Sequence, residues 1–191
     1  DAWLSGYGYR VVYVDSTVAN GGWNLIESNC IAYAAQTYTL DLTSCGLDII
    51  CANNIVRRNQ FYYNDGPGLS FTSAGNNYIC DVVFNYAYNN SFLANGLNAG
   101  YGQVDQSMIA FGNYSTIWQM RSNYIKNNVY QTYIQTNGYY PNAQAATMRA
   151  AQVFSNNWPA TTRGLPLFVS TNRASPNLTF QAASPCIDAG G

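Results

Sequence analysis

Val56-Arg57-Arg58-Asn59-Gln60-Phe61-Tyr62-Tyr63-Asn64 has the form apolar-x-x-Asn-x-apolar-x-x-Asn, and this form recurs along the chain. Residues 82–90 repeat it around Asn85, and residues 120–128 repeat it around Asn123. The first asparagines of all such windows are Asn54, Asn59, Asn85, Asn90, Asn123, Asn137 and Asn172. Independent placement of the 24 asparagines among 191 residues would give about 0.7 windows of this form. The repeat is therefore a structural signal.

Short strands joined by tight bends and stacked on one another account for this repeat. Asparagine suits a bend because it tolerates the left-handed backbone region and hydrogen-bonds to nearby backbone. In a stack, each strand pairs with its copy about 4.8 Å away, and equivalent side-chain amides form ladders. We predict a solenoid in which Asn59, Asn85 and Asn123 occupy equivalent bends of successive or near-successive coils. An antiparallel sandwich with asparagine-rich loops is the alternative interpretation.

The C-terminal segment resembles a known family. Pro166-Leu167-Phe168-Val169 is followed by a short turn, by residues 178–181 (Leu-Thr-Phe-Gln), and by residues 184–190, Ser-Pro-Cys-Ile-Asp-Ala-Gly. This order resembles the tail of bacterial and archaeal extracellular proteins with right-handed parallel β-helix repeats, in the pectate-lyase-like superfamily, which typically ends in S-P-A-I-D-A-G. Cys186 stands where that family usually has alanine. Near the other end, residues 13–15 (Tyr-Val-Asp) resemble the strand that often begins such a β-helix.

The resemblance implies an all-β protein, a right-handed parallel β-helix, and 191 residues suit one domain. We expect the first coils in residues 1–52, the repeat coils in 53–138, and a helix and the tail in 139–191. Asn142–Phe154 is the expected helix, with Asn142 at its N-terminus and one apolar stripe of Ala145, Met148, Ala151 and Phe154. Val11–Val14, Leu47–Cys51 and Leu69–Phe71 are expected strands.

Composition excludes several classes of function. Only 9% of the residues are charged, and the formal net charge is −1, which argues against a nucleic-acid partner and an electrostatically held membrane surface. Histidine is absent, so serine or cysteine nucleophiles activated by histidine are excluded. No apolar run has the length of a membrane span. We expect neither a metal site nor a cofactor, because no Cys-x-x-Cys pair occurs.

Five cysteines suggest cross-links between coils. Cys30 and Cys51 are 21 residues apart, close to one coil, and equivalent positions one coil apart lie within disulfide range. We therefore predict a Cys30–Cys51 disulfide. Cys45 and Cys80 form a possible second pair. The alternative is that most cysteines are small buried hydrophobic residues.

Candidate catalytic residues are few. Enzymes of the pectate-lyase-like class need paired carboxylates, or a base beside a cation held by acids. Asp65 and Asp81 are the best pair in this sequence, and Arg57 is the candidate base. Arg57 and Arg58 are expected to point to opposite faces of a strand, so that only one lines a given groove. Solvent-facing arginines beside a repeat are the simpler interpretation.

Seventeen tyrosines and the many amides favour contact with carbohydrate, or equally packing between subunits. The candidate carbohydrate-binding residues are Tyr62, Tyr86, Tyr88 and Tyr130. Three Asn-x-Ser/Thr sequons provide candidate glycosylation sites at Asn89, Asn113 and Asn177.

Three functional hypotheses follow. The first is a non-catalytic extracellular or cell-surface β-helix, structural or adhesive, that assembles with copies of itself or with a larger protein. A polysaccharide lyase or glycoside hydrolase is the second, and a carbohydrate-binding module is the third. The first is favoured because residues 178–187 are expected to form a final strand whose far edge no lysine protects. We expect the chain to be a subunit of an assembly or a piece of a longer protein.

Overall fold

The computed structural model describes residues 10–14, 22–34, 45–73, 81–95, 109–113, 119–130, 150–159 and 163–187. Within these ranges nearly all regular structure is β-strand, so the expectation of an all-β protein is confirmed. No helix among these residues is long and apolar enough to cross a membrane.

Three parallel sheets contain most of the strands, each in chain order. Sheet 1 contains β1 (Arg10–Val14), β4 (Cys45–Ile49), β7 (Leu69–Ser73) and β11 (Ile109–Asn113). Sheet 2 contains β2 (Leu25–Glu27), β5 (Ile55–Arg57), β9 (Tyr86–Tyr88), β13 (Tyr124–Lys126) and β15 (Val153–Ser155). Sheet 3 contains β3 (Cys30–Ala32), β6 (Gln60–Tyr62), β10 (Ser91–Leu93), β14 (Val129–Tyr130) and β16 (Trp158–Pro159). The parallel pairing contradicts the antiparallel sandwich.

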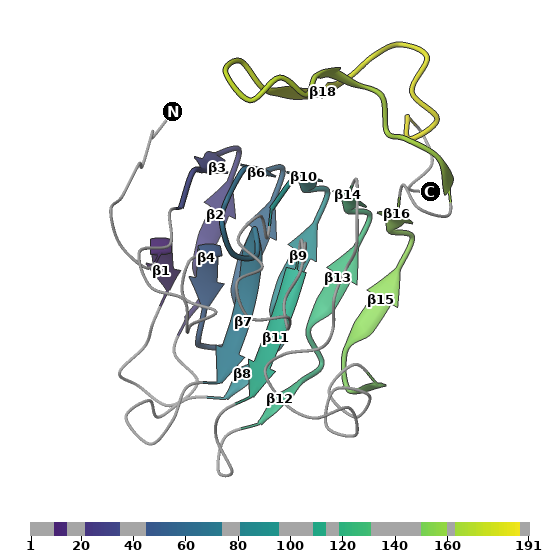
Figure 1. Cartoon of the computed structure of the whole chain (residues 1–191). Coiled ribbons are helices and arrows are strands. Elements are labelled where there is room, and N and C mark those ends of the chain that lie inside the picture. Colours follow the sequence, from purple (N-terminus) through teal and green to yellow (C-terminus); the bar gives the residue numbers. More distant parts are fainter. Residues whose placement is uncertain are drawn as a thin grey trace.

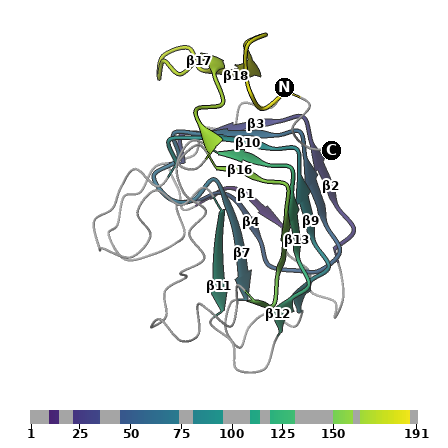
Figure 2. The same ribbon diagram turned by 90° about the vertical axis from the view of Figure 1, so that its right-hand side faces the viewer.

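The chain visits the three sheets repeatedly, and we call each such circuit a pass. In one pass β5 joins sheet 2, β6 then joins sheet 3, and β7 joins sheet 1. The short strands β8 (Val82–Val83) and β12 (Met120–Arg121) also pair in parallel. Equivalent residues in successive passes are 30, 31, 38 and 29 positions apart. Figure 1 shows the strands side by side, and Figure 2 shows sheet 3 across the top with sheet 2 down one side.

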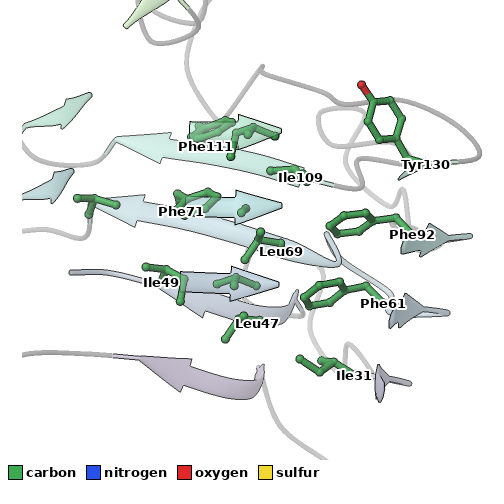
Figure 3. Packing of buried hydrophobic residues seen from close by; sticks show 14 of the residues in the cluster. Ile31, Leu47, Ile49, Phe61, Leu69, Phe71, Phe92, Ile109, Phe111 and Tyr130 are labelled. Atoms are coloured by element: carbon green, nitrogen blue, oxygen red, sulfur yellow. The ribbon is translucent and has the colours of Figure 1, made fainter. Parts of the chain in front are cut away.

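The core lies between the sheets, and its side chains stack in register. Phe61 of β6 lies against Phe92 of β10, with ring centroids 4.8 Å apart and planes 7° from parallel. Phe71 and Phe111 form the equivalent stack in sheet 1, at 5.2 Å. Figure 3 shows the two stacks facing each other across the interior. All four rings are fully buried, so burial of apolar area from both sheets stabilises the stack of strands.

Asparagine ladders line the corners between the strands, as the repeat predicts. In the first ladder, the Nδ2 atoms of Asn24, Asn54 and Asn85 each donate to Oδ1 of the next member, ending at Asn123, which donates to Oε1 of Gln152. The backbone N–H of each donor binds the same oxygen. The second ladder contains Asn29, Asn59, Asn90, Asn128 and Asn157. A shorter third ladder joins Asn64 to Asn95.

The predicted equivalence of Asn59 with Asn85 and Asn123 is wrong in part. Asn85 and Asn123 do share a ladder, but Asn59 belongs to the neighbouring corner and bonds to Asn90. The repeat misleads because corners recur every five residues within one pass, so Asn54 and Asn59 both match the pattern. The register of β5 with β9 aligns Ile55 with Tyr86, which makes Asn54, not Asn59, the equivalent of Asn85.

Residues with left-handed backbone precede the ladder asparagines. Asn53, Arg58 and Tyr63 have φ of 62°, 55° and 53°, and Asn54, Asn59 and Asn64 follow them. Left-handed φ at a non-glycine residue costs of order 1 kcal/mol, and the buried ladder bonds that follow offset this cost.

The helix expected at Asn142–Phe154 is wrong at its C-terminal end. Val153–Ser155 is strand β15, in which Phe154 pairs with Ile125 of β13. Gln152 explains the difference, because its amide takes the place of an asparagine at the end of the first ladder and donates to the carbonyl of Met120. Residues 142–149 lie outside the described residues.

The tail does not add a final strand to the stack. Instead, β17 (Phe168–Ser170) and β18 (Asn177–Phe180) pair as an antiparallel hairpin, which lies over the outer face of sheet 3 in Figures 1 and 2. Phe168, Leu178 and Cys186 pack on Tyr62 and on other outward side chains of that sheet. Burial of this apolar face explains why the tail folds back onto the sheet.

Two tyrosine hydroxyls also hold the tail. The hydroxyl of Tyr63 donates to the carbonyl of Thr171, and that of Tyr33 donates to the carbonyl of Arg173 at 2.6 Å. Burial, with a smaller effect of Tyr33, raises the pKa of Tyr63, so its hydroxyl stays protonated and able to donate at neutral pH.

The predicted Cys30–Cys51 disulfide is wrong. Cys30 is exposed at the start of β3, whereas Cys51 is buried beside Asn54, and the two form no disulfide. Register explains this, because the residue one pass after Cys30 is Gln60. Cys45 is buried, and Cys80 of the other suggested pair lies outside the described residues.

Candidate functional site

Arg57, the candidate base, is held in a surface ion pair. Its Nε and Nη2 atoms donate to the two carboxylate oxygens of Glu27 at 2.8 and 2.9 Å, and Nη1 donates to the hydroxyl of Tyr88 at 3.0 Å. The hydrogen bond from Arg57 lowers the pKa of Glu27, and the bond to Glu27 raises the pKa of Arg57. A guanidinium held this way cannot accept a proton from a substrate.

The prediction that Arg57 and Arg58 serve opposite faces is also wrong. Arg58 lies past the end of β5 with left-handed φ, and its Nη1 atom reaches the same Glu27 at 3.3 Å. The alternation of strand side chains stops at a left-handed residue, so both arginines lie on the outer side of sheet 2.

Asp65 and Asp81, the candidate carboxylate pair, are not brought together. Asp65 follows β6 and Asp81 precedes β8, and Figure 1 shows β6 and β8 at opposite ends of β7. The five residues of β7, about 16 Å in length, lie between these two elements. Oδ1 of Asp81 instead accepts the backbone N–H of Gln119 at 2.8 Å.

The four tyrosines expected to bind carbohydrate are all engaged in contacts within the chain. Tyr62 is covered by the tail, and Tyr130 is buried in the core. Tyr86 lies between Ile55 and Tyr124 in register, and its ring stacks on Tyr124 at 4.6 Å with planes 4° from parallel. The hydroxyl of Tyr88 accepts the bond from Arg57. Sugar rings stack on aromatic faces, and the mutual stack of Tyr86 and Tyr124 uses one face of each ring.

The outer face of sheet 2 carries a row of exposed and half-buried apolar side chains, which we name the apolar stripe. One register position on successive strands contributes Leu25, Ile55, Tyr86, Tyr124 and Val153, and the corner before it contributes Trp23 and Phe84. The side chains of Trp23, Leu25 and Tyr86 are 78%, 56% and 40% exposed. Contiguous exposed apolar side chains are the kind of surface feature from which an interaction can be proposed.

A polar row runs beside the apolar stripe. The register position two residues on contains Glu27, Arg57, Tyr88, Lys126 and Ser155. The ammonium group of Lys126 lies 5.3 Å from the ring of Tyr124, and the guanidinium of Arg121 lies 5.8 Å from that of Phe84. An apolar centre with a polar rim is the usual anatomy of a protein interface.

Most of the apolar stripe was missed from the sequence. Sheet 2 strands have only three residues, so alternation is too short to detect, and Trp23 and Phe84 stand at bends where loops are expected. The usable signal was the apolar residue directly after each ladder asparagine, at Leu25, Ile55 and Tyr86.

The candidate glycosylation sites lie in different settings. Asn89 is exposed at a corner with φ of 55°, and Asn177 is exposed in β18, where its Oδ1 atom accepts the N–H of Thr179. Asn113 lies in β11, paired with Ser73. The side chains of Asn89 and Asn177 are therefore both exposed.

No protein-family model matches this chain, and no curated protein or solved structure is significantly similar to it.

Proposed function

We propose that the three parallel sheets form a right-handed parallel β-helix of the extracellular repeat type that the tail resembles. Chain-order parallel pairing, the recurring ladders and the stacked core side chains support this. The right-handed sense follows from the strong preference of parallel strand connections for that hand.

We propose further that the protein acts without catalysis, as a structural or adhesive component outside the cell or on its surface. The positions of β6 and β8, which carry the flanking Asp65 and Asp81, at opposite ends of β7 support this, as does the ion pair of Arg57 with Glu27. Surface labelling of intact source cells tests the location, and exclusive recovery of the protein from the cell interior would contradict it.

The apolar stripe carries the functional proposal: copies of the chain associate through it. Five strands at about 4.8 Å spacing make a stripe about 19 Å long. Tyr86 and Tyr124 stack on each other, so one face of each ring is covered within the chain, which favours contact with an apolar protein surface over stacking of a sugar ring. A formal net charge of −1 gives little repulsion between copies. A patch of this size is at the low end of specific interfaces, so we expect micromolar association.

Charge complementarity selects one two-fold arrangement. The two-fold axis lies parallel to the strands, between the two packed sheets. It places β5 of one copy over β9 of the other, so the strands of the second copy run across the interface in the opposite order. Glu27 of one copy then faces Lys126 of the other, and Arg57 faces Tyr88. In the same register Ile55 lies over Tyr86, so apolar residues meet apolar residues. Such a self-complementary patch is what a closed two-fold dimer requires.

Sedimentation velocity over a concentration series tests the association. The wild-type protein is expected to shift from monomer to dimer, and Tyr86→Lys is expected to remain monomeric. Val169→Lys, a matched change at an exposed position of the tail, should associate like the wild type, and near-ultraviolet circular dichroism verifies that both variants fold. A wild-type protein that stays monomeric throughout, or a Tyr86→Lys variant that associates equally well, overturns the proposal.

A further inference from the structure

A cavity of about 350 Å³ lies between the tail and the edge of sheet 3 where it meets sheet 2. One wall comes from the corner and the first residues of sheet 3, and the other comes from Phe180 and Cys186 of the tail. The volume falls in the lower part of the range for small-molecule sites, which suits a ligand of one or two rings. None of the residues discussed above as a catalytic candidate lines it.

Three asparagines of the corner supply the polar groups. Asn89, Asn127 and Asn156 occupy the same corner in successive passes, with φ of 55°, 53° and 51°, and all three line the cavity. Each directly precedes a member of the second ladder. The passes are about 4.8 Å apart, so the three amides form a row of donors and acceptors at that spacing.

The remaining walls are apolar or neutral. Val129, Trp158 and Phe180 line the cavity with Ser91, and none of the described residues that line it is charged. The indole N–H of Trp158 donates to the carbonyl of Gly164 at 2.9 Å, and the guanidinium of Arg163 lies 5.5 Å from the ring, which fixes the position of the indole. A fixed aromatic ring near amides and a hydroxyl matches the groups that bind a neutral polyol ring.

We propose that this cavity binds a neutral sugar unit of a glycan. Asn89, Asn127 and Asn156 exchange hydrogen bonds with hydroxyls of the sugar, and Trp158 and Phe180 cover its apolar C–H surface. An acidic sugar is disfavoured, because the described lining residues offer its carboxylate no ion pair in exchange for lost hydration. The site is separate from the apolar stripe, so sugar binding and self-association are independent functions.

Asn89 is both a lining residue of the cavity and the asparagine of a glycosylation sequon. A glycan attached at the Asn89 sequon would occupy the mouth of the cavity, so modification at Asn89 and binding of a free sugar exclude each other. The binding experiment therefore uses the full chain made in bacteria without glycosylation.

Titration with neutral disaccharides tests the proposal, with binding detected from NMR shifts of the asparagine side-chain amides. The neutral ligands are cellobiose, lactose and N,N′-diacetylchitobiose, and digalacturonate is the charged comparison. At least one neutral disaccharide is expected to bind, and Asn127→Gly is expected to weaken it about tenfold, as loss of a buried hydrogen bond does. Asn53→Gly is the matched control, because Asn53 has the same left-handed backbone at a different corner, with φ of 62°. Its affinity should equal that of the wild type.

Three results would overturn the proposal. They are no binding of any neutral disaccharide at millimolar concentration, binding of digalacturonate alone, and equal affinities of Asn127→Gly and wild type. Sedimentation of the same samples reports separately on the apolar stripe, so failure of one proposal leaves the other standing.

Discussion

Asn85 donates its side-chain Nδ2–H to Oδ1 of Asn123 at 2.9 Å, although the two residues are 38 positions apart. Oδ1 of Asn85 itself accepts two bonds from Asn54, and Nδ2 also donates to the carbonyl of Cys51. Every polar atom of this fully buried amide is therefore used. Because the same arrangement recurs at each level, an amide ladder fixes the register of three sheets at once.

Asn85→Ala is expected to lower the free energy of unfolding by about 3 kcal/mol, because it leaves buried donors of Asn54 without their acceptor. Chemical denaturation measures the change. Asn24→Ala is the matched control at the exposed end of the same ladder, where only the bond to Asn54 is lost, and it should cost about 1 kcal/mol or less. Equal losses in the two variants would contradict the ladder account.

Glu27 is expected to titrate below its ordinary pKa of 4.5 because Arg57 binds its charged form. A carboxyl group whose pKa is lowered on folding stabilises the protein above its unfolded pKa, and this stability is lost as the pH falls through the folded value. NMR titration of the Glu27 side chain measures this directly. Arg57→Gln should move the pKa up toward 4.5; an unchanged pKa would show that the ion pair does not persist in solution.

Cys30 is expected to react rapidly with a thiol reagent in the folded protein, because it is exposed, whereas buried Cys51 should react only after unfolding. Mass spectrometry of the labelled peptides distinguishes the two. Cys30→Ser should remove the fast reaction without changing the slow one. A Cys30–Cys51 disulfide in the purified, unreduced protein would restore the prediction from sequence and contradict the register of β3 with β6.

Phe168→Ala is expected to loosen the tail from sheet 3. Phe168 is 5% exposed and stacks on Phe180 at 5.7 Å, so its removal should cost about 3 kcal/mol of local stability. Val169→Ala, at the next residue, is the control, since a side chain that is 52% exposed contributes little. Faster proteolysis within residues 163–187 in Phe168→Ala, but not in Val169→Ala, is the expected result. Equal cleavage rates would contradict it.

The asparagine repeat was sufficient to predict parallel stacking and amide ladders. Asparagine is both the bend residue and the ladder residue, so one residue type reports both features. Strands at Val11–Val14, Leu47–Cys51 and Leu69–Phe71 were also predicted close to β1, β4 and β7. The ladder to which each asparagine belongs was not predictable. The same sequence form marks two corners five residues apart within one pass and equivalent corners in successive passes.

Other features depend on contacts that local pattern does not encode. Gln152 replaces an asparagine in the ladder, so a helical spacing of apolar residues up to Phe154 concealed β15. The tail folds back because Tyr62, Leu93 and Val129 make the outer face of sheet 3 apolar, which becomes visible only when the strands are aligned. Asn89, Asn127 and Asn156 were likewise not recognised from the sequence, because they come together beside the cavity only when the strands are aligned.

Cross-linking of mixed variants tests association through the apolar stripe most directly. In a Cys30→Ser background, Glu27→Cys protein is mixed with Lys126→Cys protein carrying a size tag, and the mixture is oxidised under mild conditions. The proposed two-fold arrangement predicts that disulfide-linked heterodimers form in preference to homodimers of either variant, and that adding Tyr86→Lys abolishes them. Absence of the heterodimer, or cross-linking in the same yield with Tyr86→Lys present, would contradict the account.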